Sequence, residues 1–141
     1  METITATYSG HLRTVAVHQT SGAQVVTDAP VDNQGKGESF SPTDLVAVAL
    51  GNCILTIMGI AGRSHDFDIE GTKLRITKIM ESNPRRIGEI VIDVDFPPLN
   101  YTEKQKQILR QCVNSCPVAF SLHPDVKQNV RLNFYQEKNG P

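Results

Sequence analysis

The stretch SPTDLVAVALGNCILTIMGIA, residues 41–61, decides the fold of this chain. Ser41 is a typical N-cap residue, Pro42 suits the first helical position, and Asp44 stands where an acidic side chain completes a capping box. Beyond Asp44 apolar residues occupy nearly every face of a helix, a pattern typical of full burial. The stretch therefore predicts a long buried helix that begins at residue 42.

The apolar run over 45–61 is 17 residues long, which is at the lower limit for a membrane span of about 20 residues. Asn52 and Thr56 near its middle, and strand-like sequence on both flanks, favour a core helix instead. One chain of 141 residues with short strands can hardly cover such a helix on all sides. We therefore expect one face to be buried against a second subunit, which predicts a homodimer and no membrane partner.

Strand-like sequence flanks the predicted helix on both sides. Before it, three short alternating runs are separated by Ser-Gly turns, which predicts an antiparallel meander over 3–8, 12–18 and 23–27. Residues 28–40 are rich in Asp, Pro, Asn and Gly and predict a loop. After the helix, two longer alternating runs joined by the turn SNPRR predict a hairpin over 72–81 and 87–96.

The last third of the chain adds helices and one strand. Thr102 is a suitable N-cap for a helix over 103–115, where apolar residues recur at helical spacing. A short helix from Pro117 to residue 122 and a strand over 126–135 follow. The order is βββ-α-ββ-α-(α)-β, with strands and helices in blocks, so the sequence predicts an α+β fold in a single domain, residues 1–141.

Composition narrows the class of protein. The 141 residues carry a formal net charge of −1, with 39% hydrophobic and 21% charged residues, which is typical of a globular domain. Basic residues are scattered and Trp is absent, so we expect no nucleic-acid partner and no membrane-surface partner. The N-terminus lacks the charged-then-apolar pattern of a signal peptide, which predicts a cytoplasmic location.

Three cysteines, Cys53, Cys112 and Cys116, are an odd number in a chain too large to need disulfide staples. Each is therefore either a small buried residue or a thiol with a chemical role. A nucleophilic Cys53 needs a cation nearby, because it lies about ten residues beyond the N-cap, outside the reach of the helix dipole. Arg13 and Lys36 are the candidates upstream of the helix.

The other two cysteines have different surroundings in the sequence. Cys116 precedes Pro117, so it is the predicted N-cap of the short helix, a position that stabilises a thiolate. Cys112 falls on the apolar stripe of the helix over 103–115, which predicts a core residue. Together with His123 and Cys53 they could be zinc ligands, but paired C-x2-C elements are absent, so we expect no metal and no cofactor.

Two segments resemble the signatures of the OsmC/Ohr family. The first is GKGESFSPTDLVAVALGNC, residues 35–53, with a small-residue loop, a Ser-Pro helix start and a cysteine in the apolar helix. The second is Cys116-Pro117-Val118, followed by a last strand over 130–135 that ends in an aromatic residue. The resemblance covers essentially the whole chain in order.

The resemblance implies an OsmC-like fold, an intertwined homodimer in which antiparallel sheets built from both chains surround two long central helices. It also implies thiol-dependent reduction of hydroperoxides, with Cys53 as the peroxidatic cysteine and Cys116 as the resolving cysteine. The partners it implies are a small-molecule hydroperoxide, either organic or hydrogen peroxide, and an external thiol reductant.

The chain departs from the family around the activating residues. Family peroxidases usually carry Glu directly after the helix-start proline, where it orients an Arg on the reactive thiol, whereas this chain has Thr43. Glu38 in the preceding loop could replace that Glu. Arg13, which follows the first predicted turn, is the residue predicted to activate Cys53. The alternatives are Lys36 and, from a partner chain, Arg63 or Arg110.

Two functions therefore stay open at this point. The first is a thiol-dependent peroxidase, as the resemblance implies. The second is a non-catalytic homodimer of the same fold that binds a small apolar molecule or has a structural role, which Thr43 in place of Glu favours.

Overall fold

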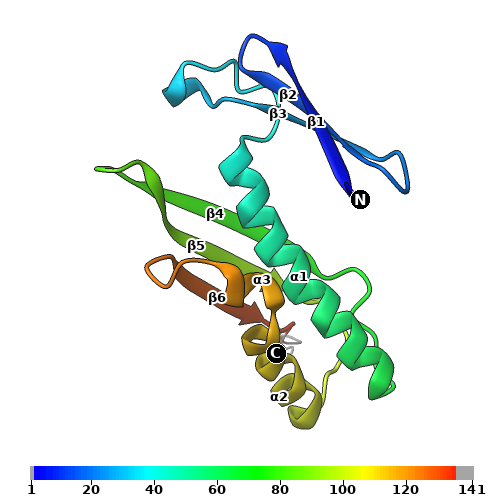
Figure 1. Cartoon of the computed structure of the whole chain (residues 1–141). Helices are drawn as coiled ribbons and strands as arrows, with labels where there is room; N and C mark the ends of the chain where they lie inside the picture. The colour runs from blue at the N-terminus through cyan, green and yellow to red at the C-terminus, as the bar shows by residue number, and fades with distance from the viewer. Residues whose placement is uncertain (1, 136–141) are drawn as a thin grey trace. The chain divides into compact units, whose positions relative to one another are not determined.

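The computed structural model describes residues 2–135 and has the predicted α+β element order (Figure 1). The chain divides into two compact units, Met1–Val46 and Ala47–Pro141. Each unit has its own three-stranded sheet, with strand order β1-β2-β3 in the first and β4-β5-β6 in the second. The helix α1, Pro42–Ser64, begins at the end of the first unit and continues in the second.

The first unit contains the predicted antiparallel meander. Its strands are β1 (Ile4–Gly10), β2 (Arg13–His18) and β3 (Gln24–Asp28), each paired antiparallel with the next. A single 3₁₀ turn, Val31–Asn33, interrupts the predicted loop. Within the described residues, this unit buries only the polar side chains of Thr27, Asp28 and Ser41, so it lacks an apolar core of its own.

The start of α1 is fixed by the predicted capping box. The backbone N–H of Asp44 donates to Oγ of Ser41 at 3.0 Å, and the backbone N–H of Ser41 donates to Oδ2 of Asp44 at 2.9 Å. These two bonds satisfy groups that a helix start leaves without partners. The helix ends at Ser64, three residues beyond the predicted apolar run, where the N–H of Phe67 donates to the carbonyl of Gly62 at 2.9 Å.

The second unit contains the predicted hairpin, β4 (Lys73–Glu81) and β5 (Arg86–Asp95), paired antiparallel. The last strand, β6 (Lys127–Asn133), pairs with β5 in parallel, so the prediction of purely antiparallel sheets is wrong for this strand. The reason is the connection: α2 (Glu103–Cys112) and α3 (Pro117–Ser121) lie between β5 and β6 in the chain. Parallel neighbours need such a crossover, which returns the chain to the same end of the sheet.

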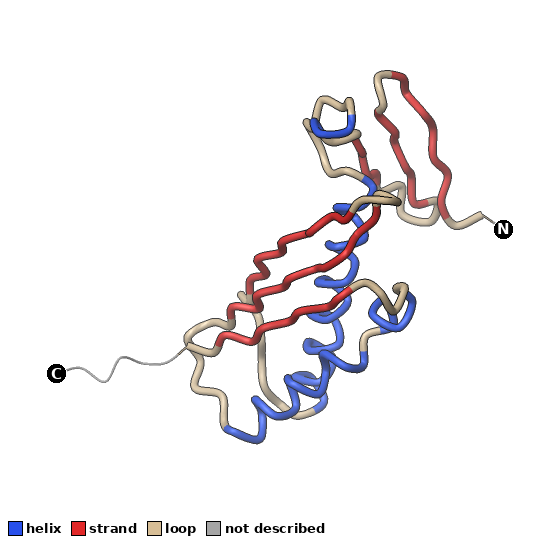
Figure 2. The backbone as a smooth tube through the Cα atoms, turned by 90° about the vertical axis from the view of Figure 1, so that its left-hand side faces the viewer, coloured by secondary structure: helices blue, strands red, loops and turns tan. Residues whose placement is uncertain are grey.

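The helix predicted over 103–115 is α-helical only to Cys112 and continues as a 3₁₀ turn, Val113–Ser115. Its predicted N-cap is confirmed, because Thr102 forms a reciprocal capping box with Gln105. Figure 2 shows the helices of the second unit on one side of the β4-β5-β6 sheet. The opposite face of this sheet carries charged pairs between neighbouring strands, such as Arg131 with Asp93 at 2.6 Å.

The apolar core of the second unit lies between these helices and β5. Its fully buried side chains are Leu50, Ile54 and Met58 of α1, Ile90, Ile92 and Val94 of β5, Leu109 of α2, and Cys116. The α1 residues recur every four positions and the β5 residues every second position, so each set occupies one face of its element. Burial of each such side chain stabilises the fold by about 1.5–3 kcal/mol.

One chain covers only part of α1. By length and composition this is the one helix among the described residues that could cross a membrane, and 33% of its most apolar window is buried. Core helices of water-soluble proteins meet the same criterion, so this weak signal leaves the predicted core helix in place. The face that carries Ile60, which is 58% exposed, is left open, as expected for a helix that one chain cannot cover.

Candidate functional site

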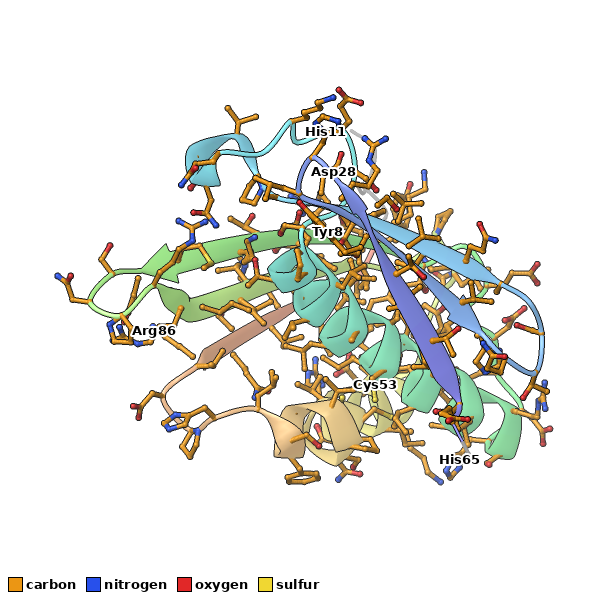
Figure 3. All side chains as sticks on the ribbon, turned by 45° about the horizontal axis from the view of Figure 1, so that its top comes forward. Tyr8, His11, Asp28, Cys53, His65 and Arg86 are labelled. Atoms are coloured by element: carbon orange, nitrogen blue, oxygen red, sulfur yellow. The ribbon has the colours of Figure 1, made fainter. Side chains whose placement is uncertain are left out.

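The second unit brings together two cysteines that stand 63 positions apart in the sequence. Cys53 is a half-buried residue of α1 (Figure 3), and Cys116 is fully buried at the junction before α3. The Cys116 Sγ lies 4.0 Å from the carbonyl oxygen of Leu50, one helical turn before Cys53. The side chain of Cys53 contributes to the raised pKa of Cys116, so the two thiols lie near each other, and both are free.

Cys116 is the N-cap of α3, as predicted, but it does not gain the predicted acidity. The backbone N–H of Ala119 donates to Sγ of Cys116 at 3.4 Å, which favours a thiolate. Burial opposes this effect and is the larger cause, so the pKa of the Cys116 thiol is raised, and the nearby Cys53 raises this pKa further. The expectation that the cap makes Cys116 a favoured thiolate is therefore wrong, because burial disfavours the charged form.

Cys112 is a core residue, as predicted. Its side chain is buried in the apolar cluster, and its Sγ donates to the carbonyl of Ile108 at 3.2 Å within α2. Burial raises the pKa of the Cys112 thiol. Across residues 2–135, no group of three or more His, Cys, Asp or Glu side chains is arranged to hold a metal ion.

Arg13 forms the centre of an ion-pair cluster in the first unit. It begins β2 directly opposite Asp28, the last residue of β3. Its Nε donates to Oδ1 of Asp28 at 2.7 Å, and its Nη2 donates to Oδ2 of Asp28 at 2.8 Å and to Oε2 of Glu38 at 3.2 Å. The hydrogen bonds from Arg13 lower the pKa of Asp28, and those to Asp28 raise the pKa of Arg13.

The sequence prediction placed Glu38 near Arg13 but missed Asp28, which it assigned to the loop. Glu38 does contact Arg13, so the structure brings this pair together. Asp28 could have been found from strand register, because the turn between β2 and β3 sets residue 13 opposite residue 28. Arg13 belongs to the first unit and Cys53 to the second, so its predicted action on Cys53 stays a prediction.

The second unit also has a cavity of about 610 Å³ beside the C-terminal half of α1. Thr56, three residues after Cys53 and so on a neighbouring part of the same helix face, is one of its walls. Its lining combines apolar and charged side chains from α1 and the following loop: Ile60, Arg63, Phe67, Asp68, Ile69 and Glu70. A cavity of this volume can hold a small organic molecule.

The chain combines an α+β fold, one long apolar helix and two neighbouring cysteines. Comparison with known protein families and solved structures identifies the family to which it belongs. The profile of OsmC-like proteins matches residues 35–131. A solved structure from Psychrobacter arcticus 273-4, provisionally named an osmotic stress induced and detoxification response protein, is 47% identical. The match covers 94% of this chain and 96% of that chain, with a TM-score of 0.90. The chain therefore belongs to the OsmC family.

More distant structures share the fold. An organic hydroperoxide resistance protein OsmC from Legionella pneumophila is 14% identical over 94% of this chain and 98% of that chain, with a TM-score of 0.71. An organic hydroperoxide resistance protein from Elizabethkingia anophelis is 16% identical over 96% of this chain and 98% of that chain, with a TM-score of 0.68. A comparison with curated protein sequences gives no match.

Proposed function

We propose that this chain is a thiol-dependent hydroperoxide reductase in which Cys53 is the peroxidatic cysteine and Cys116 the resolving cysteine. The observation that carries this proposal is the position of Cys116 beside the Cys53 turn of α1: its Sγ lies 4.0 Å from the carbonyl oxygen of Leu50, three residues before Cys53, and Cys53 contributes to its raised pKa. Membership of the OsmC family, in which solved relatives are named organic hydroperoxide resistance proteins, supports the same chemistry.

The first step uses Cys53, which is the more exposed of the two thiols. Its thiolate attacks the terminal oxygen of the hydroperoxide, so an S–O bond forms and the O–O bond breaks. The leaving oxygen departs with the electron pair and takes a proton, which releases an alcohol from an organic hydroperoxide or water from hydrogen peroxide. Cys53 is oxidised to a sulfenic acid in this step.

The second step uses Cys116. Its thiol loses a proton and the sulfur attacks the sulfur of the Cys53 sulfenic acid, so an S–S bond forms, the S–O bond breaks and water leaves. An external thiol reductant then returns the disulfide to two thiols by exchange. Burial of Cys116 suits this order, because a protonated buried thiol leaves the first attack to Cys53.

Activation of Cys53 is assigned to Arg13 within the same proposal. A guanidinium stays charged at all relevant pH values and offers several donors, which suits the stabilisation of a thiolate. The two hydrogen bonds to Asp28 and one to Glu38 use Nε and Nη2 of Arg13, and Nη1 takes part in none of them.

We also propose a homodimer with a cytoplasmic location. The first unit exposes apolar side chains and lacks an apolar core within its described residues, and α1 leaves Ile60 exposed. Contact with a second copy would cover such surfaces, as symmetric interfaces commonly do. Sedimentation at micromolar concentration should give a species near twice the chain mass of 15.5 kDa, and a stable folded monomer would contradict the dimer.

Single-turnover kinetics test the enzymatic proposal. Reduced protein mixed with cumene hydroperoxide should lose peroxide and two thiols per chain, with a Cys53–Cys116 disulfide found by peptide mass spectrometry. Cys53→Ser should abolish the reaction, whereas Cys116→Ser should stop at a sulfenic acid that dimedone traps. A parent protein that reacts no faster than free cysteine would refute the proposal.

The rate of alkylation distinguishes the peroxidase from the alternative function, a non-catalytic dimer that binds a small molecule or has a structural role. The rate of Cys53 alkylation is measured against pH in Cys112→Ser, Cys116→Ser protein. A midpoint well below about 8.5, the value of free cysteine, supports the peroxidase. A midpoint at or above that value favours the non-catalytic protein.

A further inference from the structure

We propose that the cavity beside the C-terminal half of α1 binds the external thiol reductant, and that this reductant is a small thiol with both an ammonium and a carboxylate group. The inference rests on the proposed function, because that mechanism needs a thiol to return the Cys53–Cys116 disulfide to its reduced form. All the residues that carry it lie inside the second unit, Ala47–Pro141.

The cavity lies on the Cys53 side of α1. Cys53, Thr56 and Ile60 are spaced three and four residues apart, so they follow one another along one face of the helix. Thr56 and Ile60 are walls of the cavity, whose volume is about 610 Å³. In Figure 3, the labels of Cys53 and His65 mark the two ends of this half of the helix. A molecule in the cavity therefore lies beside the turn of α1 that carries Cys53.

The rim of the cavity carries opposite charges. Arg63 comes from the last turn of α1, whereas Asp68 and Glu70 come from the loop that follows, and all three residues are exposed. Within residues 2–135, the side chains of Arg63 and Glu70 form no hydrogen bond or ion pair. A guanidinium binds a carboxylate through two parallel hydrogen bonds, and carboxylates attract an ammonium group. This arrangement of charges is complementary to a molecule that carries both groups.

The wall between these charges is apolar and is held in place by the fold. Half-buried Phe67 and Ile69 form it. The backbone N–H of Phe67 donates to the carbonyl of Gly62 at 2.9 Å, and its ring meets that of Tyr101 edge-on, with 6.1 Å between the centroids. The hydroxyl of Tyr101 donates to the backbone carbonyl of Asp68 at 2.7 Å. These contacts order the loop before a ligand arrives, which lowers the entropic cost of binding.

The reduction consists of two thiol–disulfide exchanges. The thiolate of a bound reductant attacks the sulfur of Cys53, which is more exposed than that of Cys116. A new S–S bond forms, the Cys53–Cys116 bond breaks, and Cys116 leaves with the electron pair and takes a proton. A second reductant thiolate attacks the sulfur of the first reductant and releases Cys53 as a thiolate. Two reductant thiols are thereby oxidised to one disulfide, and two protein thiols are restored.

The experiment measures the rates at which four small thiols reduce protein that has been oxidised with diamide, so that no peroxide is needed. Cysteine carries both charged groups, cysteamine only the ammonium, mercaptopropionate only the carboxylate, and mercaptoethanol neither. Each rate is divided by the rate of the same thiol with hydroxyethyl disulfide, because thiols differ in nucleophilicity. After this correction, cysteine should react at least threefold faster than each of the other three thiols.

Four variants assign this preference to the cavity. Arg63→Gln should slow cysteine and mercaptopropionate at least twofold but not cysteamine, whereas Glu70→Gln should slow cysteine and cysteamine at least twofold but not mercaptopropionate. Gly59→Leu should remove the preference, because Gly59 lines the cavity and a Cβ added there meets no atom within 4 Å, which leaves room for the larger side chain. The control Lys104→Gln, on the exposed surface of α2 and outside the cavity lining, should leave all four rates unchanged.

Equal corrected rates for the four thiols, or a cysteine preference that Arg63→Gln and Glu70→Gln both leave intact, would overturn the inference. A second copy that covers this face of α1 would give the first of these results. Arg63 and Glu70 are exposed, so their variants decide the question even if Gly59→Leu does not fold. Failure of the proposed function gives a different result, a thiol preference in a protein that does not reduce cumene hydroperoxide. Peroxide reduction without any thiol preference would refute the reductant site alone.

Discussion

Oxidation of this protein by one equivalent of hydroperoxide should make it markedly more resistant to urea. The proposed disulfide joins Cys53 to Cys116, which are 63 positions apart, and both cysteines lie in the same compact unit. A crosslink removes conformations from the unfolded chain, and the gain grows with the length of the closed loop. A loop of this length corresponds to about 4 kcal/mol of added unfolding free energy.

That free energy translates into a measurable shift. With a urea m-value of about 2 kcal/mol/M, 4 kcal/mol moves the unfolding midpoint by about 2 M. The measurement is circular dichroism against urea for reduced and oxidised protein, without added thiol and at one protein concentration, because unfolding of a dimer depends on concentration. Cys112→Ser serves as the matched control and should keep the full shift, whereas Cys53→Ser and Cys116→Ser should show none.

A contrary result would have a clear meaning. If mass spectrometry finds the Cys53–Cys116 disulfide but the urea midpoint stays the same or falls, the bond forms only with strain in the folded protein. This strain then offsets the stabilisation that the crosslink gives by restricting the unfolded chain. The two side chains would then not be held ready for a disulfide, although they lie near each other in the thiol form. The assignment of Cys116 as the resolving cysteine would lose its structural basis.

Three further predictions concern pH and packing. Because burial raises the pKa of Cys116, disulfide formation from the sulfenic acid should still accelerate as pH rises above about 8.5, which rapid-quench thiol counts against pH would check. Gly62→Ala should lower the unfolding free energy by about 1–3 kcal/mol, because the new Cβ would lie 2.6 Å from a backbone oxygen. The control Gly59→Ala meets no atom within 4 Å and should raise it by up to about 1 kcal/mol, as urea titrations of both would show. Hydrogen bonds from Arg75 lower the pKa of Asp95 to about 2, so stability present above about pH 4 should fall as pH drops through about 2, and Asp95→Asn should flatten that acid limb in CD titrations.

Much of the fold was predictable because local chemistry determines it. The capping box of Ser41 and Asp44 marks the start of α1, and the apolar run that follows predicts a buried helix. The pair Cys116-Pro117 likewise marks the start of α3, because proline is favoured at the first helical position. These signals lie within a few residues of each other and need no knowledge of the rest of the chain.

The direction of β6 was not predictable in the same way. Its alternating residues match either direction, because a parallel and an antiparallel strand share the same side-chain period. The direction depends on whether the preceding helices return the chain to the start of β5 or leave it at the end. The pairing of Arg13 with Asp28 similarly depends on the register between two strands. The predicted third strand ended at residue 27, one residue before Asp28, so this pair was not predicted.

The roles of the two cysteines illustrate how tertiary structure can reverse a local argument. From its neighbours alone, Cys116 has the better surroundings for a thiolate, because it caps a helix, whereas Cys53 lies beyond the reach of the dipole of α1. The fold places Cys116 among fully buried side chains, and the loss of water around its sulfur outweighs the backbone N–H groups of Ala119 and Val118 at the cap. Cys53 stays half-buried, within reach of solvent and of a small oxidant. A thiol that is costly to ionise and inaccessible is a poor first nucleophile, whereas its position near Cys53 suits it to the second step of the proposed mechanism, in which the sulfenic acid would form beside it. This difference in burial is the physical argument for the proposed order of attack.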